Sequence, residues 1–348
     1  MTVGELEREA ALAEIRREAE EVGRVERPGV RPEGAPFPRA DAGTGYYGLP
    51  LLKRPVWTWE VPVYFFVGGA AGAAAVVGAA ARAAGAGDLA RDARWIAAVG
   101  GAASPALLVA DLGRPERFLN MLRVFKPQSA MSVGAWTAVA FSTASAARAF
   151  ADVVRRRDGA SAPDGRSLPV RVLEDAAEPV SAATGALMAS YTGVLVGATT
   201  IPVWNRNVRV LPLHFAASGL ASAVAILELL GHRHRALNAL GMSAAAAETA
   251  VGAHHERDPD PAYAPLKRGR SGAVVRTGGV LSGPVPLVLR LLGARRAAAA
   301  SALAGSLLTR FGWVEAGKAS ADDPTLPLGL RDADGLPDTT IHEEPGKW

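Results

Sequence analysis

Apolar residues lie in long runs that are separated by short polar connections. Because an α-helix rises about 1.5 Å per residue, about 20 residues of such a run cross the hydrocarbon core of a bilayer. This pattern predicts about eight membrane-spanning helices, at 59–84, 95–112, 132–150, 179–200, 213–230, 236–253, 273–292 and 297–311. The fold class predicted is an all-α, polytopic membrane protein.

Polar side chains cluster at those ends of the apolar runs that lie on one membrane face. Consecutive helices cross the membrane in opposite directions, so the start of an odd-numbered helix and the end of an even-numbered one share a membrane face. The residues that fall on this shared face are Glu60, Tyr64, Asp111, Arg114, Ser129, Trp136, Tyr191, His214 and His254. We expect the functional site on this face.

The composition fits a membrane protein whose chemistry depends on other molecules. Hydrophobic residues make up 49% of the 348 residues. The predicted helices occupy most of the chain, which leaves no room for a separate catalytic domain. The chain has no cysteine, so it supplies no disulfide, no thiolate nucleophile and no ordinary iron–sulfur ligand set. Any electrons that pass through it are carried by a partner or by a bound organic molecule.

Polar segments flank the apolar region, which gives three parts. Residues 1–45 form a soluble N-terminal tail, which is charged at first and then broken by Pro and Gly, and which has no apolar core of a cleaved signal peptide. Residues 46–311 form the transmembrane domain, and residues 312–348 form a polar C-terminal tail. The formal net charge of +4 does not indicate nucleic acid, because the arginines lie mainly in short loops, where lipid headgroups account for them.

The basic residues in the loops predict which side of the membrane holds the N-terminus. If the N-terminus lies outside, the inner loops hold thirteen Lys and Arg residues, with Arg94 and Arg290 among them, against eleven in the outer loops. Lys and Arg are enriched in loops on the inner side. The count therefore favours an outside N-terminus by a small margin.

Ionisable residues near the helix ends have both structural and functional interpretations. A charge at the centre of a bilayer costs ~2.5–3.5 kcal/mol on insertion scales, so each needs a partner, a water cavity or a neutral form. Glu60 fits a carboxylate at headgroup level or a proton-exchanging group. Asp111 and Arg114 fit a structural ion pair, a helix cap or a catalytic pair.

Three residues within the helices leave similar alternatives. Tyr191 fits a core tyrosine or a hydroxyl that holds a quinone carbonyl. Glu228 and Glu248 fit a proton path or neutral, hydrogen-bonded carboxyls. The sequence alone does not decide between these interpretations.

Histidines test the alternative of a haem-carrying cytochrome. Two stacked haems need four axial histidines, placed near both faces of facing helices. His214 and His254 share one face, but His232 and His234 lie at the other end without histidines opposite them. The pattern does not support a diheme protein, and a single haem stays a minor alternative.

The sequence resembles the NrfD/polysulfide reductase membrane subunit family in several motifs. The resemblance begins with YGLP at 47–50, WTWE at 57–60 and YFFVGGAAG at 64–72. Its most recognisable part is DLGRPERF at 111–118 followed by KPQSAMSVGAW at 126–136, and YTG at 191–193 and PVWN at 202–205 also fit. These motifs occur in order, and the resemblance covers roughly 46–310.

The resemblance implies an integral membrane subunit of two four-helix bundles that binds menaquinone or menaquinol. It would exchange electrons with a ferredoxin-like iron–sulfur subunit attached to a molybdopterin catalytic subunit, in the bacterial plasma (inner) membrane. By position, Tyr64 matches a histidine of the polysulfide reductase member, and Tyr191 matches its quinone-contacting tyrosine. Glu60 lies next to the position of an asparagine in that member and takes over proton exchange.

The site hypothesis follows from this resemblance. Tyr64 and Tyr191 hold the quinone oxygens, and His214, Trp204 and Glu60 are further candidates for quinone binding. Protons pass to the aqueous face through Glu60 or through the Asp111/Arg114 pair. No metal, haem or iron–sulfur cluster is expected in the chain itself.

Two other functions stay open. A secondary transporter or proton-conducting protein would also have buried carboxylates, although the chain shows no inverted repeat. A purely structural anchor would tether a redox partner without binding quinone. The partner's substrate is open among formate, polysulfide, thiosulfate, nitrite and others.

Overall fold

The computed structural model describes residues 52–112, 114–157 and 168–323, together with positions 13, 17 and 326. Except for these isolated positions, the predicted tail 1–45 and the chain beyond 323 lie outside the described residues. The described residues form helices, turns and irregular connections, with no strand among them. The predicted all-α class is confirmed.

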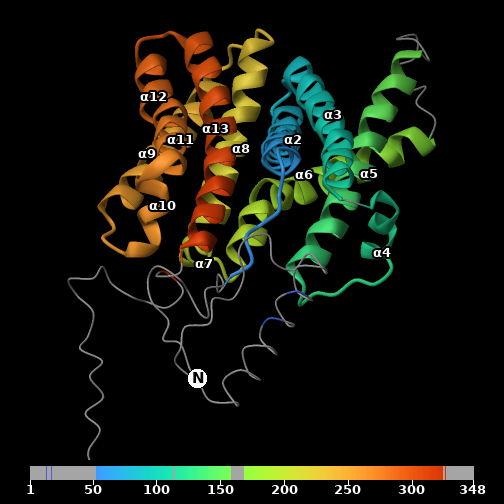
Figure 1. The fold of residues 1–348 in the computed structure, drawn as a ribbon. Coiled ribbons are helices and arrows are strands. Elements are labelled where there is room, and N and C mark those ends of the chain that lie inside the picture. The colour runs from blue at the N-terminus through green and yellow to red at the C-terminus, as the bar shows by residue number, and fades with distance from the viewer. Residues whose placement is uncertain are drawn as a thin grey trace, which may run out of the picture. The chain divides into compact units, whose positions relative to one another are not determined.

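Each predicted apolar run corresponds to a helix or to a broken pair of helices (Figure 1). In chain order these are α2 (Glu60–Ala83), α3 (Gly87–Asp111), α5 (Ala130–Arg157), α6 (Leu168–Gly197), α8 (Leu211–Leu229), α9 (Arg235–Arg257), α11 (Gly269–Ser282) with α12 (Pro284–Leu291), and α13 (Arg295–Asp322). Short helices lie in the connections: η1 (Pro115–Arg117), α4 (Phe118–Met121), α7 (Pro202–Arg206), η2 (Pro261–Tyr263) and α10 (Ala264–Lys267).

Five of these segments are long and apolar enough to cross a membrane. They are α2, α3, the part of α6 from Val172 to Gly197, α8, and α11 with α12 taken together as Gly269–Leu291. The remaining long helices, α5, α9 and α13, carry more polar and charged side chains. The predicted number of eight spans is therefore not confirmed.

The helices pack in two groups (Figure 1). The first bundle consists of α2, α3, α5 and α6, in which α2 packs against both α3 and α6, and α5 packs against α3 and α6. The second bundle consists of α8, α9, α11, α12 and α13, in which α9 packs against α8, α11 and α12. The two bundles meet where α8 packs against α2 and α6.

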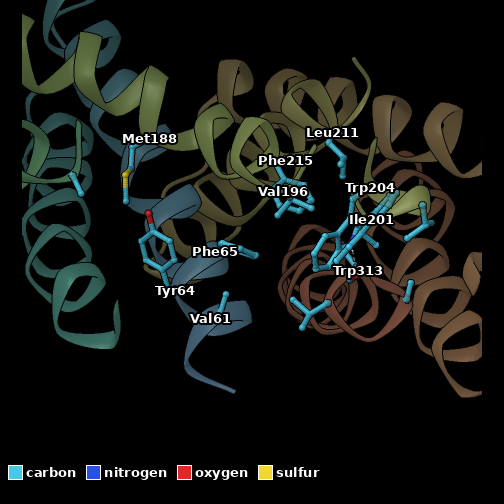
Figure 2. Packing of buried hydrophobic residues seen from close by; sticks show 14 of the residues in the cluster. Val61, Tyr64, Phe65, Met188, Val196, Ile201, Trp204, Leu211, Phe215 and Trp313 are labelled. Carbon is cyan, nitrogen blue, oxygen red and sulfur yellow. Dashed lines mark hydrogen bonds between the residues drawn. The ribbon is translucent and has the colours of Figure 1, made fainter. Parts of the chain in front are cut away.

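An aromatic core lies at this junction between the bundles (Figure 2). The rings of Phe65 and Phe215 lie 5.9 Å apart between α2 and α8. Trp204 from α7 stacks on Trp57 at 5.1 Å, and its indole N–H donates a hydrogen bond to the carbonyl of Trp313 at 2.8 Å. These contacts hold α7 and α13 at the junction.

Glycine lets α2 and α6 approach each other closely. A Cβ atom added at Gly72 would lie 2.3 Å from the carbonyl oxygen of Gly185 and 3.0 Å from the amide nitrogen of Ala189. Both atoms belong to the backbone, so a side chain at this position requires the helices to separate. Small residues serve this purpose in membranes, where lipid provides no hydrophobic drive for helix association.

Replacing Gly72 by Ala is expected to destabilise the first bundle by about 1–3 kcal/mol, the usual cost of overpacking a core. The measurement is the thermal unfolding midpoint of the purified protein in detergent. Gly87→Ala is the matched control, because a Cβ at that position meets no atom within 4 Å. Equal midpoints for the two variants would contradict the close packing of α2 on α6.

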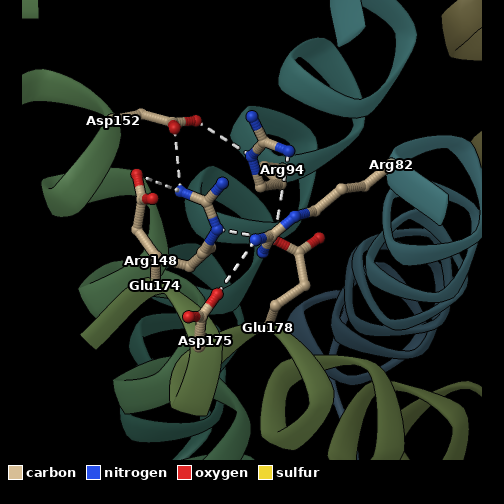
Figure 3. Close-up of polar contacts among 7 residues, drawn as sticks. All are labelled: Arg82, Arg94, Arg148, Asp152, Glu174, Asp175 and Glu178. Carbon is tan, nitrogen blue, oxygen red and sulfur yellow. Dashed lines mark hydrogen bonds and ion pairs between the residues drawn. The ribbon is translucent and has the colours of Figure 1, made fainter. Parts of the chain in front are cut away.

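A cluster of buried charges joins the helices at the end of the first bundle that is opposite Glu60 (Figure 3). Asp152 of α5 accepts hydrogen bonds from Arg94 Nε at 2.9 Å and from Arg148 Nη1 at 2.8 Å. Arg148 Nε also donates to Glu178 of α6, which pairs with Arg82 of α2 at 3.3 Å. Each helix of the first bundle therefore contributes to one network of ion pairs.

The structure removes the small excess of basic residues in the inner loops that favoured an outside N-terminus. Arg94 lies within α3 and Arg290 within α12, and both are buried. Arg290 forms a bidentate ion pair with Glu228, with N–O distances of 2.9 and 2.8 Å. Without these two arginines the thirteen inner-loop residues become eleven, equal to the outer loops. The pairing also neutralises Glu228, which the sequence left open as part of a proton path.

The last helix continues beyond the predicted boundary at residue 311. α13 reaches Asp322, and Trp313, Val314 and Ala316 are almost fully buried in it. The boundary was placed at residue 311 because the segment from Gly312 onward is polar, contains Pro and is net acidic. Its first residues are nevertheless buried, so the helix continues into this segment.

Candidate functional site

Two of the carboxyl groups on the predicted functional face meet at one hydroxyl group. Thr58, just before α2, is hydrogen-bonded through its hydroxyl to the carboxylate of Glu60. The same hydroxyl lies 2.9 Å from Asp111 Oδ1 at the end of α3, and the Thr58 amide donates to that oxygen at 3.3 Å. The start of α2 and the end of α3 are thus joined, as expected for antiparallel neighbours.

This arrangement suits the exchange of a proton. A threonine hydroxyl has one proton to donate and two lone pairs to accept with. It can therefore donate to one carboxylate while it accepts from the other when that carboxyl is protonated. Glu60 and Asp111 are both partly exposed, so the cluster is open to the aqueous side.

Arg114 does not take part in this cluster. It is exposed, and within the described ranges no ion pair joins it to Asp111. The backbone becomes extended at Leu112, directly after α3, which ends the helix before Arg114. The ion pair that the spacing allowed is therefore not formed.

Tyr64 lies one helical turn after Glu60 on the same face of α2. Its side chain is 4% exposed, and the phenol oxygen points toward Met188 of α6 (Figure 2). Among the residues described, the hydroxyl group has no hydrogen-bond partner. A phenol hydroxyl without a partner can donate a hydrogen bond to a ligand oxygen.

Tyr191 belongs to α6, and its side chain packs against the start of α5. Its hydroxyl donates a hydrogen bond to the carbonyl of Ala130, and its ring packs directly on Gly134. Next to this contact, Ser129 lines a hollow of about 310 Å³ beneath the connection between α4 and α5. Trp136, also on the predicted face, is 38% exposed and packs edge-on against Phe125.

His214 belongs to a different part of the molecule. A row of aromatic rings separates it from Tyr64: Phe65 lies 5.6 Å from Tyr64 and 5.9 Å from Phe215, which lies 5.8 Å from His214. His214 faces Glu248 of α9, at the floor of a cavity in the second bundle. The structure therefore divides the predicted quinone-binding residues between the two bundles.

Trp204 has a packing role. The side chain is 1% exposed, one ring face is covered by Trp57, and its N–H already has an acceptor. The indole is therefore enclosed by protein in this structure. The sequence made it a candidate only because it falls in a family motif.

Within the described ranges, His214 and His254 do not face each other as a pair of haem ligands would. His214 faces Glu248, whereas His254 is exposed and lies edge-on to Tyr263 with ring centroids 6.2 Å apart. The part of the chain that the structure describes contains no group of three or more His, Cys, Asp or Glu residues that could hold a metal ion.

Sequence analysis missed Thr58, Ser282 and Arg310. Thr58 bridges Glu60 and Asp111, and its position two residues before Glu60 is the only signal for it. Ser282 donates a hydrogen bond to Glu248 at 2.9 Å, and Arg310 lies 3.7 Å above the ring of Phe215. These contacts join distant segments, so spacing along the chain does not indicate them.

Helices long and apolar enough to cross a membrane, with polar residues gathered at their ends, define a multi-pass membrane protein. The model of the family described as "Polysulphide reductase, NrfD" matches residues 51–238, more than half of the chain. The chain belongs to the NrfD family, and its resemblance to that family is confirmed. A search of curated proteins gave no match. The matched region covers the first bundle and α8, and the cavity in the second bundle lies largely outside it.

Proposed function

We propose that this chain is the membrane subunit of a respiratory oxidoreductase complex in the bacterial plasma membrane. It binds a quinone or quinol of the menaquinone type and exchanges electrons with an iron–sulfur subunit that is attached to a molybdopterin catalytic subunit. The observation that carries the proposal is the unpaired hydroxyl of Tyr64, one turn from the cluster formed by Glu60, Thr58 and Asp111.

The chemistry of the side chains around Tyr64 supports the binding of a quinone ring. Such a ring is flat and largely apolar, with oxygens at its edge that accept hydrogen bonds. Phe65 and Met188 provide apolar surroundings, and Tyr64 provides a donor without a partner. Tyr191 would join the site by exchanging its bond to the Ala130 carbonyl for one to the ligand. When bound, the quinone supplies two-electron chemistry that is coupled to two protons.

The cluster at Thr58 would move the protons. When Glu60 is protonated, it donates to the Thr58 hydroxyl, and that hydroxyl passes its own proton to Asp111. The proton leaves from Asp111 to water, because that carboxyl is partly exposed at the end of α3. A carboxyl that exchanges a proton in this way contributes typically 10²–10⁴-fold to a rate, as general acid–base groups do.

The connection after α3 is suited to hold the partner. It follows Asp111 directly and exposes basic residues at 114, 117, 123 and 126. Leu119, Val124 and Phe125 are also 54–69% exposed on the same connection. Apolar anchors among positive charges would bind an acidic face of an iron–sulfur protein. In this proposal Arg114 serves docking.

Purification of the tagged chain from native membranes tests the assembly. We expect an iron–sulfur protein and a molybdopterin protein to be recovered with it, and the large subunit then identifies the substrate class. Recovery of the chain alone in a mild detergent, without any redox partner, would contradict the proposal and favour a transporter.

Replacing Tyr64 by Phe in the purified complex is expected to lower quinol turnover about tenfold, the effect of one lost hydrogen bond of ~1.4 kcal/mol. The measurement is the steady-state rate with a soluble quinol. Tyr263→Phe is the control, because it removes the same group from a buried tyrosine in the connection between α9 and α11. Equal rates for both variants would remove Tyr64 from the site.

A further inference from the structure

A cavity of about 280 Å³ lies in the second bundle, among α8, α9, α11 and α13. Its walls are mainly apolar, with Leu266, Val275, Val280 and Trp313 among them. The volume is just below the ~300 Å³ at which pockets for drug-sized ligands begin. It therefore fits a small, largely apolar molecule.

Buried polar atoms without partners lie at the floor of this cavity. The side chains of His214 and Glu248 are 6% and 0% exposed. His214 Nδ1 and Glu248 Oε1 lie 3.3 Å apart, but they are not aligned as a hydrogen bond and have no other partner in the described chain. The other Glu248 oxygen is used, because it accepts from Ser282. Buried polar atoms in proteins are nearly always satisfied, so this pair points to a ligand.

His255 adds a further acceptor to the lining. Its Nε2 lies 2.9 Å from the amide oxygen of Asn207, so Nε2 carries the hydrogen and Nδ1 is left to accept. Burial lowers the pKa of His255 to about 3, with further contributions from His214 and His254. The ring is therefore neutral in the physiological range.

The cavity has space beside α9 and α11, and it is open beside α11. A Cβ atom at Gly252 of α9 or at Gly279 of α11 would meet no atom within 4 Å. Val280, which also lines the cavity, is 50% exposed. It belongs to the segment Gly269–Leu291, which is long and apolar enough to cross a membrane. A lipid-soluble molecule could therefore enter from the bilayer.

We propose that this cavity is a second ligand site, which binds a flat, lipid-soluble ring with a hydroxyl donor, the head group of a hydroquinone. The hydroxyl donates to Glu248 Oε1, and the ring lies against Trp313 and Val275. Because Glu248 and His255 offer acceptors, the hydroxylated ring binds better than one whose oxygens only accept. The inference rests on the proposed function only for the identity of the ring as a quinol.

The test is equilibrium binding of a fluorescent alkylnaphthol to the purified complex in nanodiscs, with binding to empty nanodiscs subtracted. Gly279→Leu fills the cavity with a side chain and is expected to remove one bound molecule per chain. Gly252→Val fills it from the opposite helix and should act alike. Gly87→Leu is the control, because it places the same side chain in open space outside the cavity. Unchanged thermal midpoints show that the variants are folded.

Glu248→Gln tests the polar floor at nearly constant volume. It is expected to weaken the naphthol at this site about tenfold, because the neutral amide oxygen is a weaker acceptor than the carboxylate. The methyl ether of the probe has no donor, and its weaker binding should not change. Equal losses for probe and ether would contradict the role of Glu248.

The outcomes separate this proposal from the proposed function. Full binding by both cavity-filling variants would overturn the second site, and the Tyr64 site would be unaffected. A single bound molecule that is lost in Gly279→Leu and kept in Tyr64→Phe would support the cavity and contradict the site at Tyr64. A single molecule that only Tyr64→Phe weakens would overturn the cavity proposal.

Discussion

Replacing Arg148 by Met is expected to destabilise the protein by about 3–5 kcal/mol, the usual cost of removing one partner from a buried ion pair. Arg148 is 3% exposed and donates hydrogen bonds to Asp152 and Glu178. Methionine fills similar space but leaves these carboxylates buried with fewer positive partners. Most single domains have a total stability of about 5–15 kcal/mol, so this loss is a large part of it.

The measurement is the fraction of folded protein after a pulse of protease in detergent, across a denaturant series. Arg82→Met is the control, because the Arg82 side chain is 38% exposed and its pairs with Asp175 and Glu178 are worth ~1 kcal/mol at most. Asp152→Asn should partly rescue Arg148→Met, since it removes one of the two buried carboxylates that lose a positive partner in that variant. Equal stability of the two Arg variants would show that the network does not hold the first bundle.

Replacing Glu60 by Gln is expected to lower quinol-driven electron transfer by about 100-fold or more, the range for loss of a general acid–base group. The amide keeps the size of the side chain but cannot take up a proton. In the proposed site Tyr64 holds the ring and Glu60 only exchanges the proton, so the quinol concentration at half-maximal rate should change little. The measurement is the turnover of the purified complex with quinol, as a full concentration series.

Glu116→Gln is the control, since it makes the same change in an exposed side chain on η1. Asp111→Asn should resemble Glu60→Gln, because both carboxyl groups bind the same hydroxyl. The combined variant should be little slower than either single one, as expected for residues that act as a unit. A rate for Glu60→Gln equal to that of Glu116→Gln would remove the cluster from the proton path.

Alternation of helix directions was sufficient to group Glu60, Tyr64 and Asp111. The rule needs only the order of apolar runs, and the structure brings Glu60 and Asp111 to the same hydroxyl of Thr58. The all-helical class followed from the same runs. These features depend on the sequence within single helices and on their order.

Features that depend on contacts between distant segments were not predictable. Arg94 was counted as a loop residue, because a charge beside an apolar run ordinarily marks the end of that run. Arg148 was not singled out. Arg94 pairs with Asp152, 58 residues away, and Arg148 pairs with Glu178, 30 residues away along the chain. His214 and Tyr64 share a predicted face for the same reason, although Phe65 and Phe215 separate them in space. The pattern of apolar runs predicts the membrane face on which a residue lies, but it does not predict which other residues on that face it contacts.

Electron exchange between quinone and partner is the central claim, and the most direct test follows the iron–sulfur clusters of the purified complex in liposomes. We expect added quinol to reduce the clusters, or added quinone to oxidise pre-reduced clusters, rapidly in the native complex and slowly in Glu60→Gln. The catalytic subunit must be active with a soluble electron carrier, so that the complex is known to be intact. No exchange in either direction by such a complex would contradict the account.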